Sequence, residues 1–375
     1  MRVLFAGGGT AGHINPALAV AGYIRKKEPD VQILYVGAKG GMEERLVPQA
    51  GFAFEGISVS GFKRSFSPSA VKDNIITVKK ALQAGTVSKR IIRDFKPDIC
   101  MGTGGYVSGP VIRAAAKLSI PTVIHEQNAF PGVTTKMLSR YVKRVMLAMP
   151  EAKQYLSDGC RCVTTGNPVR QEILTADKTA CRKKLGLDSR PVVLSFGGSL
   201  GARKINENVA GMIARSAKDG KYQIIHAYGQ YGKWFPDLLR KMGADPDGCE
   251  NLDIREYIDD MPVCLAAADL VICRAGAITL SELQAQGKPA ILIPSPNVAE
   301  NHQYHNAMAM ANRQAARVLK EEELTQEAVM QAVDDMVSDP EKLRKYSENA
   351  KRLAITDANE RIYSVIKKVL GTAAV

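Results

Sequence analysis

The sequence predicts an α/β protein with two doubly wound domains, each a parallel sheet with helices on both faces. Short apolar runs rich in Val, Ile and Leu alternate with helix-length segments along the whole chain, as in covered parallel sheets. The 375 residues are enough for two such domains. VLFAGGGTAGHIN from residue 3 and VVLSFGGSLGARKIN from residue 192 both have the pattern of a strand, a glycine-rich turn and a helix. This repeat indicates one Rossmann-like unit in each half.

The apolar runs define the expected strands, and most neighbouring strands are separated by a stretch long enough for a helix. In the first half we expect strands at residues 2–6, 31–36, 54–59, 98–102, 121–125, 144–148 and 161–165. In the second half we expect them at residues 191–196, 222–228, 252–257, 269–273, 289–293 and 315–319.

The domain boundary is predicted at GNPVR, residues 166–170, because turn-forming residues lie there between the two series of strands. The first domain is then 1–165 and the second 166–350. The charged stretch from about 338 to 370 predicts two helices. We expect the last helix, within 351–375, to pack back on the first domain.

Composition excludes several classes of protein. With 45% hydrophobic and 24% charged residues the chain is neither disordered nor collagen-like. No apolar run approaches the ~18 to 20 residues that span a bilayer. No signal-peptide core follows Met1, so we expect a cytoplasmic protein. The seven scattered cysteines fit a reducing compartment and predict neither disulfides nor a zinc site.

Charge is distributed unevenly between the two halves. Residues 1–165 contain 23 Lys and Arg against 11 Asp and Glu, a net +12, whereas residues 166–375 contain 28 against 27, a net +1. This asymmetry predicts that the first domain contacts something anionic, such as nucleic acid, phospholipid headgroups or a phosphorylated substrate.

The first glycine-rich turn, residues 7–12, formally matches the dinucleotide-binding pattern G-x-G-x-x-G after a strand. The second strand, however, ends in Tyr35-Val36-Gly37-Ala38-Lys39 without an acidic residue to hold a ribose, which disfavours a nicotinamide cofactor. Small residues and backbone amides still suffice to bind a phosphate. His13, just beyond this turn, is either a capping side chain or a general base near neutral pH.

The second turn, residues 197–201, formally matches the G-x-S-x-G nucleophile elbow, with Asp269, His302 and His305 following in hydrolase order. A serine hydrolase using Ser199 is therefore an alternative. The near-copy of this turn in the first half has Thr10 at the serine position, which favours two loops that bind phosphates.

No metal site is predicted. Asp245-Pro246-Asp247 spells D-x-D, a pattern that can hold a metal bound to a nucleotide diphosphate, but the adjoining Gly243 and Gly248 indicate a solvated surface turn. His302 and His305 have the spacing of a shared helical face, and no third ligand is evident. We expect neither a metal nor another cofactor.

Seven segments, taken in order, closely resemble the bacterial cell-wall transferase family commonly called MurG, which moves N-acetylglucosamine (GlcNAc) onto undecaprenyl-pyrophosphoryl-muramoyl-pentapeptide. The segments are GGGTAGH at 7–13, GTGGYVSGP at 102–110, HEQNAFPG at 125–132, GNPVR at 166–170, GGSLGAR at 197–203, EYIDDM at 256–261 and CRAGAITLSE at 273–282. The resemblance implies a GT-B fold, in which an N-terminal acceptor domain and a C-terminal donor domain face each other across a cleft.

The resemblance also implies a set of donor contacts for UDP-GlcNAc. Glu282 looks like the ligand of the ribose hydroxyls, Ile258 would face the uracil, and the turn at Ser199 would hold the diphosphate with the start of the next helix. The complete donor set is Thr10, Asn128, Arg170, Ser199, Asn206, Ile258, Ala277, Ile278, Thr279, Glu282 and Gln303.

On the acceptor side the resemblance implies one catalytic residue, His13, as the general base that activates the muramoyl 4-hydroxyl. Glu126 is an alternative base or could share the proton. The acceptor set is Gly8, Gly9, Gly12, His13, Tyr106 and Glu126. Three positions depart from the family pattern. Ala11 replaces a glycine, which requires a negative φ at that residue. Leu200 replaces a common Gln, and His302 precedes Gln303 where the family often has a Gln-Gln pair.

The implied reaction transfers GlcNAc to lipid-linked MurNAc-pentapeptide with inversion, and another GT-B transferase of UDP-sugars is the nearest alternative. A nucleic-acid-binding module fits less well, because no nucleic-acid motif is present. Residues 61–93 combine apolar and basic side chains, which predicts docking to the anionic inner surface of the membrane. We therefore expect a peripheral protein on the cytoplasmic face of the cell membrane. The residues behind this prediction are Phe62, Phe66, Ile75, Ile76, Val78, Leu82, Lys63, Arg64, Lys72, Lys79, Lys80, Lys89, Arg90 and Arg93.

Overall fold

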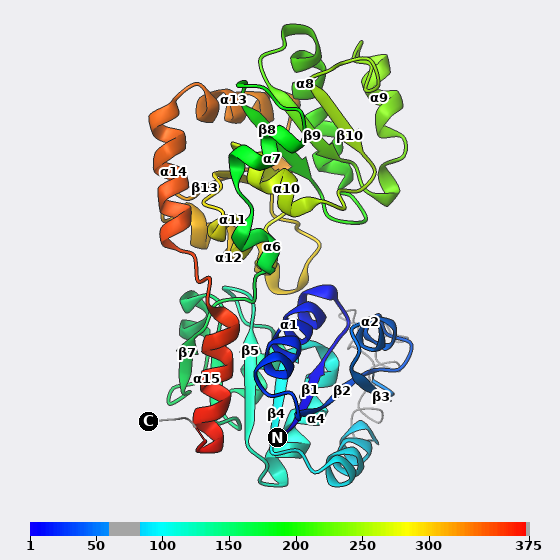
Figure 1. Cartoon of the computed structure of the whole chain (residues 1–375), viewed down its shortest axis with the longest axis vertical. Coiled ribbons are helices and arrows are strands. Elements are labelled where there is room, and N and C mark those ends of the chain that lie inside the picture. The colour runs from blue at the N-terminus through cyan, green and yellow to red at the C-terminus, as the bar shows by residue number, and fades with distance from the viewer. Residues whose placement is uncertain (60–82, 373–375) are drawn as a thin grey trace. The chain divides into compact units, whose positions relative to one another are not determined.

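A computed structural model describes residues 1–59 and 83–372. The chain divides into two compact units (Figure 1). Unit 1 consists of Met1–Pro168 together with Asp357–Val375, and unit 2 consists of Val169–Thr356. Within the described ranges, no helix has the length and apolar character needed to cross a bilayer.

Unit 1 contains a seven-stranded sheet in the order β3-β2-β1-β4-β5-β6-β7, and the neighbouring strands are parallel. The strands are β1 (Arg2–Gly7), β2 (Gln32–Ala38), β3 (Ala53–Ile57), β4 (Ile99–Gly104), β5 (Thr122–Glu126), β6 (Arg144–Leu147) and β7 (Cys162–Thr164). Strand order reverses at β1 and β4, which creates the switch point where ligands of such sheets bind.

Helices cover both faces of this sheet, because successive strand residues point to opposite sides. Val3 and Phe5 face one apolar cluster, while Leu4 and Ala6 face the other. The described helices of unit 1 are α1 (Ala11–Lys27), α2 (Glu43–Gln49), residues 83–95, α4 (Gly105–Lys117), α5 (Val133–Leu138), the 3₁₀ helix η1 (Pro150–Tyr155) and α15 (Ala358–Leu370).

Helix α15, from the end of the chain, lies beside α1 in unit 1 (Figure 1). Ile362 and Ile366 are fully buried in the same apolar cluster as Val3 and Phe5. A polar contact fixes the pair of helices: Lys367 Nζ and the Tyr363 hydroxyl both donate to Glu28, at 2.8 and 2.6 Å. The core of unit 1 is therefore completed by residues that follow unit 2 in the sequence.

Unit 2 contains a six-stranded sheet in the order β10-β9-β8-β11-β12-β13, again with parallel neighbours. The strands are β8 (Val192–Phe196), β9 (Gln223–Ala227), β10 (Leu252–Arg255), β11 (Leu270–Cys273), β12 (Ala290–Leu292) and β13 (Ala316–Val318). The α-helices are α6 (Gln171–Thr175), α7 (Lys178–Lys184), α8 (Arg203–Asp219), α9 (Phe235–Lys241), α10 (Met261–Ala267), α11 (Ala277–Ala285), α12 (His302–Ala311), α13 (Gln326–Val337) and α14 (Pro340–Arg352), and the 3₁₀ helices are η2 (Gln230–Gly232), η3 (Ala299–Asn301) and η4 (Glu321–Glu323).

The strands predicted from the apolar runs are confirmed, each within a few residues at its ends. The two helices expected near the C-terminus are also present, as α14 and α15. Each glycine-rich turn follows the first strand of its sheet, at the switch point beside β4 in unit 1 and beside β11 in unit 2. Fold and motif thus place both turns where an α/β sheet binds its ligands.

Candidate functional site

The first glycine-rich turn joins β1 to α1, and we call residues 7–12 loop 1. Gly9 has a φ of +84°, a conformation that a side chain would strain. Ala11 is the first residue of α1 and is not among the residues with positive φ. Ala11 therefore meets the requirement that a residue replacing the family's glycine here must not have a positive φ.

Contacts of its ring nitrogen Nδ1 hold His13 against loop 1. Its Nδ1 lies 3.1 Å from the Gly8 carbonyl oxygen and 3.3 Å from Thr10 Oγ1. A carbonyl can only accept, so Nδ1 carries the hydrogen in this arrangement and Nε2 carries the lone pair of the neutral ring. On its other side the ring lies against Gly104, where an added Cβ would come within 2.7 Å of His13 Cδ2. His13 therefore has the fixed tautomer that a general base requires.

Two further acceptor residues of the prediction differ sharply in exposure. Tyr106, on the first turn of α4, is 58% exposed. Glu126 is only 3% exposed, and its carboxylate accepts from the Asn128 N–H and Nδ2 and from the Gly132 N–H, each at 3.1 Å. In this structure Glu126 holds the loop after β5 in shape, with Asn128 as its partner. Contacts of Glu126 with the acceptor and of Asn128 with the donor stay predictions.

The second turn joins β8 to α8, and we call residues 197–201 loop 2. Gly201 has a φ of +83°, and an added Cβ there would lie 2.2 Å from the Tyr228 carbonyl oxygen. The carbonyls of Ser199 and Leu200 accept from the backbone of residues 230 and 231, at 3.1 and 3.0 Å. Backbone hydrogen bonds thus fix loop 2 to the segment after β9. Ser199 itself is exposed.

The predicted donor residues around loop 2 fall into two groups. Asn206 and Ile258 are buried at 1% and 2% exposure, and Asn206 Nδ2 donates to the Tyr228 carbonyl at 2.9 Å. Asn206 therefore supports the segment that holds loop 2. Ala277, Ile278 and Thr279 form the first turn of α11, whose backbone amides follow β11 at the switch point.

Glu282, one turn further along α11, is buried and paired with Arg170. Arg170 Nε donates to Glu282 Oε1 at 3.0 Å, while half of the Arg170 side chain is exposed. Burial raises the pKa of Glu282, and the Arg170 guanidinium opposes that rise. Gln303 lies near the start of α12, and its Oε1 accepts from the Ser295 N–H at 2.9 Å.

The serine hydrolase alternative is wrong. A catalytic triad needs a carboxylate that accepts from the histidine ring, which in turn reaches the serine. Asp269 instead binds Lys178, Arg182 and the Val192 N–H, at the amino ends of β8 and β11. Ser199 follows the carboxyl end of β8, so the strand separates the two residues.

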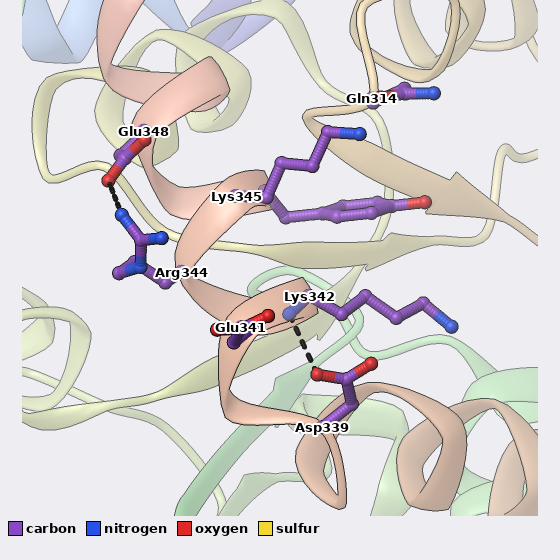
Figure 2. Close-up of a pocket in the computed structure, with 8 residues that line it drawn as sticks. Gln314, Asp339, Glu341, Lys342, Arg344, Lys345 and Glu348 are labelled. Carbon is purple, nitrogen blue, oxygen red and sulfur yellow. Dashed lines mark hydrogen bonds and ion pairs between the residues drawn. The ribbon is translucent and has the colours of Figure 1, made fainter.

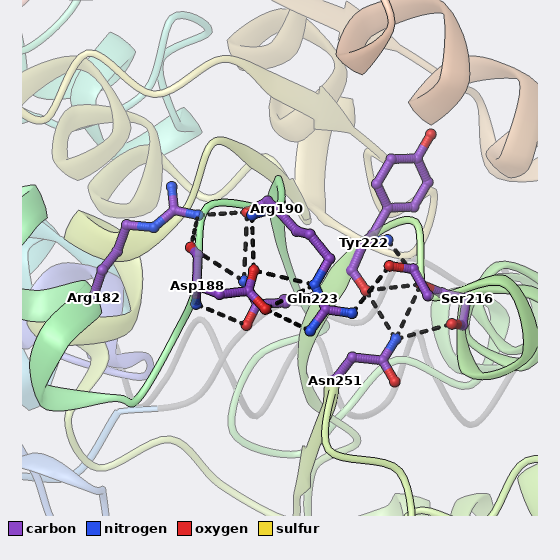
Figure 3. Close-up of polar contacts among 8 residues, drawn as sticks. Arg182, Asp188, Arg190, Ser216, Tyr222, Gln223 and Asn251 are labelled. Atoms are coloured by element: carbon purple, nitrogen blue, oxygen red, sulfur yellow. Dashed lines mark hydrogen bonds and ion pairs between the residues drawn. The ribbon is translucent and has the colours of Figure 1, made fainter.

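A polar network at the amino ends of β8 and β9 stabilises the fold. In Figure 3, Arg190 pairs with Asp188, and Gln223 contacts the same loop before β8. Asn251 donates to the Tyr222 and Ser216 carbonyls, both at 2.9 Å. These contacts satisfy backbone groups where the strands begin, at the opposite ends from loop 2.

Neither the D-x-D turn nor the hollow on α14 has the features expected of a substrate site. Asp245 and Asp247 are exposed, and Arg240 pairs with both of them. The hollow in Figure 2 is lined by charged side chains of both signs on α14, including the pair of Arg344 with Glu348 at 2.6 Å. Its lining residues lie between 314 and 348 and include neither loop 2 nor any of the predicted site residues.

A groove in unit 1 lies between the helix at residues 83–95, α4 and α5, with a volume of about 800 Å³. Its apolar lining is unusually exposed for large side chains: Tyr106 58%, Val133 53%, Met137 56% and Tyr141 50%. Four cations also line it, namely Lys89, Arg113, Lys117 and Arg140. Most of the residues behind the predicted membrane contact, including Phe62, Phe66, Lys72, Lys79 and Lys80, lie outside the described residues.

Glu43 was missed by the sequence analysis. An acidic residue that begins a helix is commonly a solvent-exposed partner of the helix dipole, so nothing singled it out. In the structure it is fully buried beneath loop 1. The glycines at 37 and 41, on either side of the turn before it, are the signal that could have indicated a buried side chain nearby.

The two parallel sheets, each with a glycine-rich loop at its switch point, are the two Rossmann-like units of a glycosyltransferase of the GT-B class. Residues 3–147 match the glycosyltransferase family 28 N-terminal domain, and residues 192–362 match the family 28 C-terminal domain. The calicheamicin glycosyltransferase CalG4 has the same fold, with a TM-score of 0.70 at 16% identity over 100% of this chain and 99% of that one.

Full-length relatives narrow the class further. The UDP-N-acetylglucosamine--N-acetylmuramyl-(pentapeptide) pyrophosphoryl-undecaprenol N-acetylglucosamine transferase of Acetivibrio thermocellus is 46% identical over 375 residues, covering 100% of both chains. That of Bacillus cytotoxicus is 42% identical, covering 99% of this chain and 100% of the relative. The crystal structure of Acinetobacter baumannii MurG has a TM-score of 0.79 at 30% identity, over 98% of this chain and 99% of that one. The chain belongs to this family of N-acetylglucosamine transferases, which confirms the predicted resemblance and fold.

Proposed function

We propose that this protein transfers GlcNAc from UDP-GlcNAc to the 4-hydroxyl of MurNAc in undecaprenyl-pyrophosphoryl-MurNAc-pentapeptide, a step of peptidoglycan synthesis. The observation that carries the proposal is the 46% identity, over the full length of both chains, with a relative named for this transfer. The order of motifs along the sequence supports the same assignment.

The donor binds unit 2 in this proposal. The Glu282 carboxylate accepts from the ribose hydroxyls, and the buried position of that carboxylate strengthens charge-assisted hydrogen bonds. Backbone amides of loop 2 and of the first turn of α11 bind the diphosphate, because helix amino termini favour anions. Ile258, Gln303 and Arg170 supply further donor contacts in unit 2.

The acceptor binds unit 1, where His13 is the general base. Nε2 takes the proton of the muramoyl 4-hydroxyl as its oxygen forms the new bond to the anomeric carbon. The bond between that carbon and the diphosphate breaks at the same time, and UDP leaves with the electron pair. One displacement inverts the anomeric configuration from α to β. The contact of Nδ1 with the Gly8 carbonyl supports this assignment, since it leaves the lone pair on Nε2.

Assay of the purified protein with UDP-GlcNAc and a short-chain lipid-linked MurNAc-pentapeptide tests the proposal. We expect one UDP released for each β-linked GlcNAc transferred. UDP-glucose and an acceptor without the muramoyl sugar are the matched controls, and both should be poor substrates. Efficient transfer of a different sugar, or to a different acceptor, would replace this function by that of another GT-B transferase.

We also propose that the groove of unit 1 docks on the anionic surface of the membrane, at its cytoplasmic face. Exposed Tyr106, Val133, Met137 and Tyr141 supply apolar surface for the interface. The four cations that line the groove supply attraction to anionic headgroups, at about 1 kcal/mol for each Lys or Arg near the surface.

Charge reversal tests the docking. Arg113→Glu, Lys117→Glu and Arg140→Glu together should release the protein from vesicles of phosphatidylglycerol and phosphatidylcholine at low salt. The control reverses the same number of exposed charges in unit 2, at Lys183, Lys184 and Lys241. Equal vesicle binding by both triple variants and the parent would rule out this surface.

A further inference from the structure

Glu43 is a fully buried carboxylate directly behind loop 1. It is the first residue of α2, which follows β2, and its exposed fraction is 0%. One oxygen, Oε1, accepts from the Ala38 N–H at 2.8 Å, and the other, Oε2, accepts from the Gly9 N–H at 3.3 Å. The carboxylate therefore joins the end of β2 to loop 1.

The glycines around Glu43 are the reason it can lie there. An added Cβ on Gly8 would lie 1.9 Å from Glu43 Oε1, and one on Gly37 would lie 2.4 Å from Glu43 Cγ. A Cβ on Gly41 would lie 2.8 Å from the carboxylate. Such distances are too short for any side chain, so three glycines, one each in loop 1, β2 and the turn before α2, leave room for this one carboxylate.

Glu43 and His13 contact the two ends of the same peptide group. The Gly9 N–H donates to Glu43 Oε2, and the Gly8 carbonyl accepts from His13 Nδ1. The Gly8 carbonyl and the Gly9 N–H belong to one peptide bond, which is planar and polarisable. A carboxylate that accepts from the N–H end makes the carbonyl end a stronger acceptor, because hydrogen bonds in a chain reinforce one another.

We propose that Glu43 is a positioning residue for His13, acting through the Gly8-Gly9 peptide. The inference rests on the proposed role of His13 as general base. In carboxylate–histidine pairs of hydrolases the carboxylate contacts the ring directly and stabilises the imidazolium that forms. Here one peptide group lies between them. It fixes the ring and its tautomer, and it favours the positive charge that His13 acquires when it takes the proton.

Tyr35 on β2 is a further titratable group close to loop 1. An added Cβ on Gly7 of that loop would lie 3.1 Å from the Tyr35 hydroxyl. Burial, and then the charge of Glu43, raise the pKa of Tyr35. Tyr35 therefore stays protonated across the working pH range, and it does not account for a change of activity near neutral pH.

The test compares Glu43→Gln with Glu44→Gln. Glu44 is the adjacent, exposed acid, whose Oε2 accepts from the Gly40 N–H at 2.6 Å, so its variant is a matched control. Two quantities are measured on the full chain: the pH profile of kcat, and the titration midpoint of the His13 ring from its carbon-bound proton by NMR.

We expect Glu43→Gln to lower kcat by roughly 10- to 100-fold, by analogy with the loss of outer partners of metal-binding side chains. The acidic limb of the kcat profile and the His13 midpoint should both move to lower pH, with the KM for UDP-GlcNAc unchanged. Glu44→Gln should match the parent in all of these. An unmoved limb and midpoint in a folded Glu43→Gln protein would overturn the inference and leave Glu43 a structural residue.

Failure of the inference is distinguishable from failure of the proposed function. A parent protein that transfers no GlcNAc refutes the function, whereas the NMR midpoint reports the link between Glu43 and His13 without any turnover. If Glu43→Gln does not fold, Glu43→Asp keeps the charge but is one methylene too short to reach both amides. It should then lose kcat, and its acidic limb should move to lower pH, though by less than in Glu43→Gln because the charge remains. Full activity in Glu43→Asp would overturn the inference.

Discussion

Loop 1 and loop 2 have nearly the same sequence and occupy the same place in their sheets, but different groups lie behind them. Behind loop 1 is the Glu43 carboxylate, which accepts a hydrogen bond from the Gly9 N–H. Loop 2 is held instead by backbone contacts with residues 228–231. The Gly9 amide is therefore used within the protein, and the negative charge of the Glu43 carboxylate disfavours an anion directly beside it. From this comparison we propose that the same glycine-rich motif positions a base in loop 1 and binds an anion in loop 2, according to what is packed beneath it.

The largest expected effect is on the side of loop 1. His13→Ala should lower kcat by about 100- to 10,000-fold, because it removes the proposed general base. The KM for UDP-GlcNAc should change little, since Glu282 and the amides of loop 2 and α11, which are proposed to bind the nucleotide, are in unit 2. Steady-state kinetics with both substrates varied give the two constants separately. A rise in acceptor KM with an unchanged acidic limb would mean that His13 only positions the acceptor, and a near-parental rate would remove it from the site.

A smaller effect, confined to donor binding, is expected beside loop 2. Glu282→Ala removes charge-assisted hydrogen bonds worth roughly 1.5 to 3 kcal/mol, which corresponds to a rise in donor KM of about 10- to 100-fold. Glu282→Gln keeps the shape but not the charge and should lie between Glu282→Ala and the parent. An unchanged KM in a folded Glu282→Ala protein would exclude Glu282 from the donor site.

The pH dependence of donor binding gives a subtler test of unit 2. In the proposed function, donor binding needs the ionised Glu282 carboxylate. Burial raises the pKa of Glu282, and the Arg170 guanidinium opposes that rise. Arg170→Ala removes the opposing charge, so the pKa rises further and the pH below which donor KM increases should move upward. Arg170→Lys keeps a positive charge and is the control. The measurement is the midpoint of donor KM against pH, and an unmoved midpoint in Arg170→Ala would contradict the pairing.

No effect is expected from chelators. Amides of loop 2 and α11 are proposed to meet the charge of the departing diphosphate. The D-x-D carboxylates already pair with Arg240. Transfer rates in EDTA should equal those in its absence. Loss of activity that magnesium or manganese restores would mean that loop 2 does not neutralise the diphosphate unaided.

The fold and the loops were predictable because both depend on local pattern. Apolar runs identify buried parallel strands, and a glycine turn between a strand and a helix identifies a switch point. The chemistry beneath the loops was not predictable, since it depends on contacts between distant segments. Glu43 and Gly9 are 34 residues apart. Asn206 and Glu126 resemble ligand contacts in the sequence but are buried against backbone groups in the structure.

Helix α15 has a consequence for how the protein is made. Translation delivers residues 169–356 of unit 2 as one continuous stretch, whereas unit 1 waits for the last helix of the chain. Until Ile362 and Ile366 leave the ribosome, the apolar face around Val3 and Phe5 has no complete cover. The half of the protein that is synthesised first can therefore complete its core only after the half that is synthesised second.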